Sequence, residues 1–175
     1  MSGESESFDP KVMIEASLRH ARKGVELGLN PLPPIADLYR VTPDGIGVVR
    51  VVLPTPTSPA VKDAWAAIIE ALIGQTGSFA YILITEAYVA RGDQMSEAEN
   101  LALAAALEHS ELSELDVPKL DVVLAQYNGP GGPLCGWMEF GEDRQLGPVE
   151  CPDTGGGFGR LVGLGGVNEE RADDA

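Results

Sequence analysis

The segment Phe79–Arg91, FAYILITEAYVAR, constrains the fold more than any other part of the chain. Its first six residues are apolar or aromatic at consecutive positions, which is typical of a strand covered on both faces of a sheet. We therefore place this strand near the centre of a sheet. Glu86 lies on the same face of that strand as Ile82 and Ile84. Because a buried charge is costly unless it is paired, Glu86 needs either a partner or a chemical role.

Three helices are predicted from their capping residues and the spacing of their apolar side chains. The first begins at Asp9-Pro10 and ends near Leu27, the second begins at Ser58-Pro59 and ends at Gly74, and the third begins at Ser96 and ends near Glu108. Ser96 and Glu99 have the spacing of a capping box, in which each side chain binds a backbone N–H of the other residue.

Strands are predicted at residues 35–41, 46–53, 79–91, 120–127, 134–140 and 145–151. The resulting order, αββαβαβββ, predicts an α/β protein of the α+β type. Its sheet should be mixed, mostly antiparallel and built from about six strands, with three helices packed on it. We expect residues 9–164 to form a single globular domain. The acidic tails at residues 1–8 and 165–175 are expected to be disordered.

The net charge of -15 limits the classes of partner. Binding to nucleic acid needs Lys and Arg side chains for the phosphates, so we expect no direct contact with nucleic acid. The N-terminus lacks a basic region followed by an apolar run, and no apolar run reaches the length of a membrane span. Two cysteines do not make a disulfide scaffold. These features favour a cytoplasmic protein without a membrane partner.

The sequence offers no motif for a metal, a cofactor or a covalent nucleophile. No two of His20, His109, Cys135 and Cys151 have the spacing of zinc ligands. The glycine-rich segment 155–166 lacks the Gly-Lys-Ser/Thr of a phosphate-binding loop. A hairpin centred on Asp143 would place Cys135 opposite Cys151, with both thiols reduced and on one side of the sheet.

Glu86 is the single candidate for a catalytic residue. A carboxylate held in a central strand could serve as a general base. The structural alternative is an ion pair with Arg50, which interrupts the apolar residues of another predicted strand. We favour the ion pair, because structural pairs also hold carboxylates at buried positions.

The stretch between Gly92 and Asp121 contains eight acidic residues and only one basic residue, Lys119. The ordinary interpretation is a solvated helix face and loop. The functional interpretation is a docking surface for a basic protein, which in the extreme case would imitate a nucleic acid. The residues assigned to this surface are Asp93, Glu97, Glu108, Glu111, Glu114 and Asp116.

Three functions follow from these features. The leading hypothesis is a non-catalytic acidic module, a small regulator or inhibitor that binds a basic protein surface. The second is a self-associating assembly subunit, in which the basic first helix of one copy meets the acidic 92–121 region of another. The third is a small hydrolase or isomerase that uses Glu86.

Overall fold

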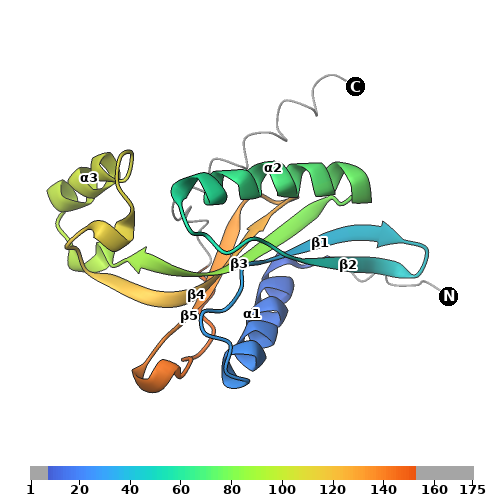
Figure 1. Cartoon of the computed structure of the whole chain (residues 1–175), viewed down its shortest axis with the longest axis horizontal. Helices are drawn as coiled ribbons and strands as arrows, with labels where there is room; N and C mark the ends of the chain where they lie inside the picture. Colours follow the sequence, from blue (N-terminus) through green and yellow to red (C-terminus); the bar gives the residue numbers. More distant parts are fainter. Residues whose placement is uncertain (1–7, 153–175) are drawn as a thin grey trace.

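The computed structural model describes residues 8–152, in which five strands form one sheet in the order β2-β1-β3-β4-β5 (Figure 1). Every neighbouring pair of strands is antiparallel. The strands are β1 (Ile35–Thr42), β2 (Gly45–Val52), β3 (Ala80–Ala90), β4 (Lys119–Asn128) and β5 (Leu134–Glu139). The predicted α+β class is confirmed, and β3 is the central strand as predicted. Among the described residues the sheet is wholly antiparallel rather than mixed.

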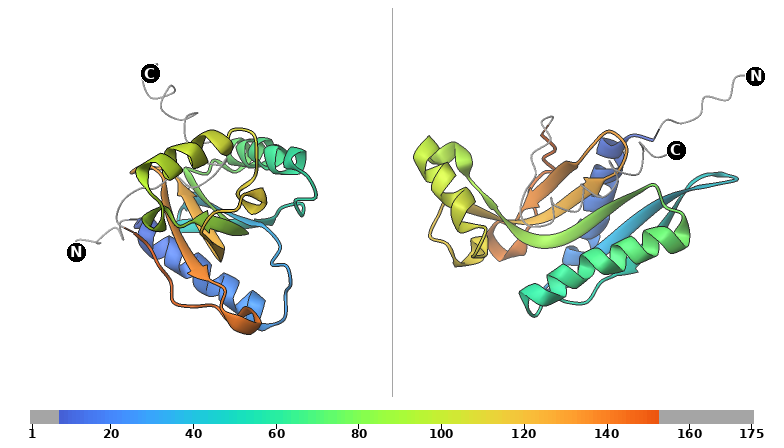
Figure 2. Two further views of the ribbon diagram at one scale, coloured as in Figure 1. Left: turned by 90° about the vertical axis from the view of Figure 1, so that its left-hand side faces the viewer. Right: turned by 90° about the horizontal axis from the view of Figure 1, so that it is seen from above.

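The helices are α1 (Pro10–Glu26), α2 (Pro59–Thr76) and α3 (Glu97–Ala106), with short 3-10 turns η1 (Gly92–Gln94), η2 (Leu112–Glu114) and η3 (Glu142–Arg144). The α1 and α2 helices cover opposite faces of the sheet, whereas α3 stands beyond the ends of β3 and β4 (Figures 1 and 2). Among residues 8–152, no helix has both the length and the apolar character that crossing a membrane requires.

Alternation along β3 explains the two layers of core. Ile82 and Ile84 pack with α1, while Tyr81 and Leu83 pack with α2, because successive side chains of a strand point to opposite faces. Of the predicted apolar stripe of α1, Ile14, Leu18 and Ala21 are buried and Val25 is partly buried. Trp65 is the largest side chain of α2 that is fully buried.

The predicted caps are formed at the starts of α1 and α3, whereas Ser58, at the start of α2, makes no side-chain cap hydrogen bond. The Asp9 side chain accepts a hydrogen bond from the Lys11 N–H at 2.9 Å, and both hydrogen bonds of the Ser96–Glu99 capping box are present. The α2 helix continues past Gly74, its predicted end, to Thr76. It ends there because Gly77 adopts the left-handed conformation, with φ of 66°, which glycine tolerates best.

Two expectations about the chain ends are corrected. Residues 145–151 form no sixth strand but only two isolated bridges, Phe140 with Leu146 and Trp137 with Glu150. Pro148 lies between the bridges and lacks the N–H that a continuous ladder would use. Phe8, assigned to the N-terminal tail, instead packs its ring against Tyr39 and Phe79. The rest of that tail, residues 165–175 and the glycine-rich segment 155–166 lie outside the described residues.

Candidate functional site

Glu86 lies on the α1 side of β3, two residues after the fully buried Ile84 on the same face of the strand. One of its carboxylate oxygens accepts a hydrogen bond from the Leu32 N–H at 2.7 Å. Arg144 forms an ion pair with the same oxygen and approaches the other at 3.5 Å. Glu86 therefore joins three segments that are distant in the sequence, and the expected basic partner is present but is not Arg50.

Arg144 reaches Glu86 from the turn that follows β5. Asp143 and Arg144 both have positive φ, 54° and 59°, a backbone conformation that non-glycine residues seldom adopt. The Arg144 guanidinium also lies over the ring of Phe140, 4.5 Å from its centroid, where a cation is attracted to the negative face of the ring. The ion pair with Glu86 and the ring contact together hold this turn against the sheet.

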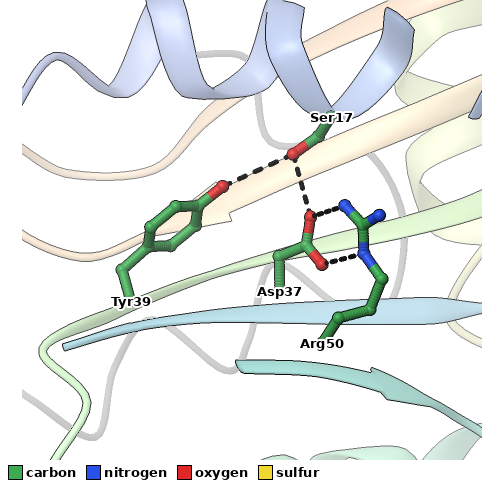
Figure 3. A network of polar contacts seen from close by, with 4 residues as sticks. All are labelled: Ser17, Asp37, Tyr39 and Arg50. Carbon is green, nitrogen blue, oxygen red and sulfur yellow. Dashed lines mark hydrogen bonds and ion pairs between the residues drawn. The ribbon is translucent and has the colours of Figure 1, made fainter. Parts of the chain in front are cut away.

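Arg50 instead binds Asp37, which stands directly opposite it on β1. Two N–H groups of Arg50 donate to the two carboxylate oxygens of Asp37, at 2.6 and 2.7 Å (Figure 3). These hydrogen bonds raise the pKa of Arg50 above its ordinary value. The predicted Glu86–Arg50 pair is thus wrong, because β1 lies between β2 and β3 in the sheet and offers Arg50 a nearer carboxylate.

The Asp37–Arg50 pair is part of a larger polar network that ties α1 to the sheet (Figure 3). The Ser17 hydroxyl of α1 donates to Asp37 at 3.2 Å, and the Tyr39 hydroxyl lies 3.4 Å from Ser17. Ser17 has a single hydroxyl proton, so Tyr39 is the donor in the second contact. Burial raises the pKa of Tyr39, which keeps that donor protonated.

The network contains a hydroxyl and a carboxylate, as many reactive sites do, but a substrate could not reach these groups from solvent. Ser17, Asp37 and Tyr39 are all buried, and only Arg50 reaches solvent. Sequence reasoning missed Asp37, although the same signal had identified Glu86. Asp37 is an acidic residue that lies between Ile35 and Tyr39 on one face of an apolar strand. A buried carboxylate needs a paired cation and further hydrogen bonds, and Arg50 and Ser17 provide these to Asp37. The network therefore fixes the position of α1 on the sheet.

The predicted acidic surface lies in a separate part of the structure, which we call the acidic arm (residues 91–118). The arm contains η1, α3 and η2 and projects from the ends of β3 and β4, at the opposite end of the molecule from the β1–β2 hairpin (Figures 1 and 2). It carries seven acidic residues and one basic residue, Arg91.

The structure divides the predicted acidic residues into two groups. Three of them are engaged: Asp93 pairs with Arg91 at 2.9 Å, Glu111 pairs with Lys62 at 3.0 Å, and Glu114 accepts from the Glu111 N–H. Glu97, Glu108 and Asp116 are exposed, and none of them forms an ion pair with another residue of the range 8–152. Five of the seven carboxylates of the arm thus have no cationic partner among residues 8–152, and two of these five, Glu99 and Glu114, make capping hydrogen bonds.

Neither cysteine has the environment of a nucleophile. Burial raises the pKa of the Cys135 thiol to about 11, and burial also raises the pKa of Cys151. Both remain reduced thiols. Cys135 packs with Val122 on the α2 side of the sheet, while Cys151 packs in the core beneath α1.

The prediction that both thiols face one side is therefore wrong. The register slips by one residue between the Phe140–Leu146 and Trp137–Glu150 bridges, and a slip of one residue turns a side chain to the other face.

A depression of about 430 Å³ lies beside the residues that follow β5, lined in part by Glu139, Glu142 and Glu150. Glu86 and Arg144 do not line it. Within residues 8–152, no group of three or more His, Cys, Asp and Glu side chains is arranged to hold a metal ion.

Comparison of the chain with models of protein families, with curated proteins and with solved structures finds no match. Function is therefore argued from the residues and their geometry alone.

Proposed function

We propose that the protein is a non-catalytic module that binds a basic protein surface through the acidic arm. The observation that carries this proposal is the position of the arm. It stands away from the sheet and the two helices that cover it (Figures 1 and 2), and Glu97, Glu108 and Asp116 remain exposed there without a described cationic partner. A patch of one sign attracts a partner of the opposite sign and raises the rate of encounter.

The outer face of α3 has the composition of a docking surface. Glu97 and Leu101 are four residues apart and share one face of α3, and Glu108 follows in the turn after the helix. Leu101 is 67% exposed, so an apolar side chain lies between two carboxylates. Interfaces commonly combine an apolar centre with a polar rim, and this face of α3 provides both on a small scale.

The arm is also held in a defined position, which favours binding because less freedom is lost on association. The Lys119 ammonium donates to the carbonyls of Leu112, Ser113 and Leu115 at 3.2, 3.2 and 2.8 Å. The Lys62–Glu111 pair connects the arm to α2. Both cations are thus used to anchor the arm at its base, away from the outer face of α3.

The assembly hypothesis has less support than the leading one. It requires a basic surface on α1, yet Arg22 donates to the carbonyls of Leu146 and Gly147, and Arg19 approaches Glu15 at 3.6 Å. The enzyme hypothesis requires a carboxylate that can accept a proton from a substrate. Glu86 is instead bound by Leu32 and Arg144.

The proposal is tested with a fluorescent oligolysine peptide, whose affinity for the full chain is measured by anisotropy at several salt concentrations. The test variant combines Glu97→Gln, Glu108→Gln and Asp116→Asn. We expect it to bind at least about tenfold more weakly, because three exposed charge contacts of about 0.5 kcal/mol each are lost. The salt dependence of binding should also become shallower.

A matched control removes the same charge from other exposed positions: Asp44→Asn, Asp63→Asn and Glu70→Gln. These residues lie on the β1–β2 turn and on α2, outside the arm. The control should bind the peptide almost as tightly as the unmodified protein. If the control loses as much affinity as the arm variant, net charge rather than the arm attracts basic partners, and the proposal is wrong.

A further inference from the structure

The outer edge of β2 is open. β2 pairs only with β1, in an unbroken register from Thr42–Gly45 to Ile35–Val52. Within residues 8–152, no backbone hydrogen bond reaches this outer edge. The other edge of the sheet is different, because Trp137 of β5 exchanges two backbone hydrogen bonds of 2.9 Å with Glu150. β2 is therefore the edge at which the sheet can accept another strand.

Apolar side chains gather on the α1 side of this edge. Three of them belong to β2: Ile46, Val48 and Val52 are 39, 51 and 63% exposed. The fourth, Val41 of β1, pairs with Ile46 and is 77% exposed. We call these four residues the β2 strip. They are exposed because α1 packs mainly on β3, β4 and β5 and does not extend over β2. Edge strands are usually protected by lysine, proline or a bulge. Residues 45–52 contain no lysine and no proline, and their register with β1 has no bulge.

The charge of the edge indicates what covers it. Arg50 is the one charged residue in the sequence of β2, and Asp37 neutralises it at 2.6 Å. The whole chain carries a charge of -15, so two copies repel each other over most of their surfaces. The β2 edge is a neutral apolar strip on which two copies can meet. A basic partner would gain no attraction there.

We propose that β2 pairs with β2 of a second copy, antiparallel about a two-fold axis that places Val49 opposite its own counterpart. This pairing joins the two five-stranded sheets into one. It sets Ile46 opposite Val52, and Val48 opposite Arg50, of the second copy. An axis one residue further along, at Arg50, would place the two guanidinium groups against each other, which is unfavourable.

The antiparallel arrangement also separates the charged parts of the two copies. The acidic arm lies at the opposite end of the molecule from the tip of the β1–β2 hairpin (Figures 1 and 2). Because a two-fold axis through β2 reverses the strand direction, the two arms come to lie at opposite ends of the dimer. The strongest repulsion between the copies is thereby avoided, and both arms stay accessible.

Sedimentation equilibrium of the full chain tests the association. We expect a monomer–dimer equilibrium that shifts towards the dimer as salt is raised, because salt screens the repulsion between acidic copies. Assembly of α1 against the acidic arm would show the opposite dependence, since salt weakens attraction between unlike charges. A chain that stays monomeric up to a concentration of about 1 mM, the limit for a weak complex, would overturn the proposal.

Substitution at Val48 tests the register. Val48→Lys would place a cation opposite Arg50 of the second copy and should weaken the dimer about tenfold, because the pair occurs twice in the dimer. Val48→Glu should weaken it less, since an anion would face that guanidinium. If only the net charge of -15 mattered, Val48→Lys would dimerise more tightly than Val48→Glu, because it reduces the repulsion between copies. A tighter dimer for Val48→Lys than for Val48→Glu would therefore refute this register.

Val12→Lys is the matched control for these variants. Val12 is 49% exposed, close to the 51% of Val48, and lies on α1. This variant should dimerise like the unmodified protein. If it weakens the dimer as much as Val48→Lys does, the β2 edge is not the interface.

Cross-linking gives a second measurement that does not depend on charge. In the proposed register Val49→Cys should form a disulfide between copies under mild oxidation, because residues opposite each other have suitable spacing. Val48→Cys, which would face Arg50, should not. Equal cross-linking of both variants, or none while the dimer persists, would overturn the proposed pairing.

Discussion

Arg50 and Asp37 stand opposite each other on β2 and β1, and two N–H groups of Arg50 bind the two carboxylate oxygens of Asp37. The Asp37 side chain is only 2% exposed, so the charge of Arg50 is its main compensation. The same pair leaves the edge strand without net charge, and thus connects the stability of the sheet with the surface proposed for self-association.

The Arg50→Ala variant should be strongly destabilised. Removing the guanidinium leaves a buried carboxylate without its counter-ion, which costs about 3 kcal/mol. Arg91→Ala is the matched control, because Arg91 and Arg50 are equally exposed at 34%, whereas the partner of Arg91, Asp93, is 64% exposed. Loss of that surface pair should destabilise the protein much less, because water solvates both groups when the pair is broken. Urea unfolding measures both, and equal losses would show that Asp37 does not depend on Arg50.

Glu86 and Arg144 should be energetically coupled. Their side chains are 20% and 32% exposed, so the loss on breaking the pair should be smaller than for a fully buried one. Glu86→Gln and Arg144→Gln are each expected to cost about 1–2 kcal/mol, and the double variant little more than either. Urea unfolding of the four proteins gives the coupling energy. Additive losses would mean that Leu32 alone stabilises Glu86.

Two Gly→Ala substitutions should have opposite effects. At Gly136 an added Cβ would lie 2.6 Å from the Cys151 sulfur and 2.7 Å from Ile14, so Gly136→Ala should cost about 1–3 kcal/mol through overpacking. At Gly74, inside α2, an added Cβ meets nothing within 4 Å. Gly74→Ala should stabilise the protein by about 0.5–1 kcal/mol. Thermal unfolding decides, and a destabilised Gly74→Ala would contradict the expected gain in helix propensity.

Cys135 should make the fold sensitive to alkali. Burial raises the pKa of its thiol from 9.0 to about 11, so the unfolded chain loses this proton at a lower pH than the folded protein does. The stabilisation is complete below pH 9.0 and is lost as the pH approaches 11. For a shift of this size the loss is about 2–3 kcal/mol.

The measurement compares urea unfolding of the unmodified protein and Cys135→Ala at neutral pH and at alkaline pH. The substitution removes the titrating thiol, so the stability advantage of the unmodified protein should narrow as the pH rises. Cys151→Ala serves as the comparison, since Cys151 is only half-buried. An advantage that stays constant with pH would show that Cys135 titrates normally in the folded protein.

The candidate site was only partly predictable. An acidic residue within an apolar strand correctly indicated that Glu86 has a basic partner, but the same signal was overlooked at Asp37. The identity of the partners depended on strand order. Since β1 separates β2 from β3 and strands lie about 4.8 Å apart, Arg50 meets the carboxylate of the adjacent strand. Arg144 could not have been predicted as the partner of Glu86, because the conformation of its turn determines where its side chain lies.

What the sequence by itself determined is local. The N-cap of Asp9, the capping box of Ser96 and the alternation along β3 act between residues close in the chain, so the elements and their buried faces could be predicted. Only the tertiary structure decided which distant residues meet, such as Arg22 with Gly147 and Glu86 with Arg144. It also decided that residues 145–151 form bridges rather than a strand, and that α3 stands apart as an arm. These outcomes depend on register and packing between separated segments, for which no local pattern contains the information.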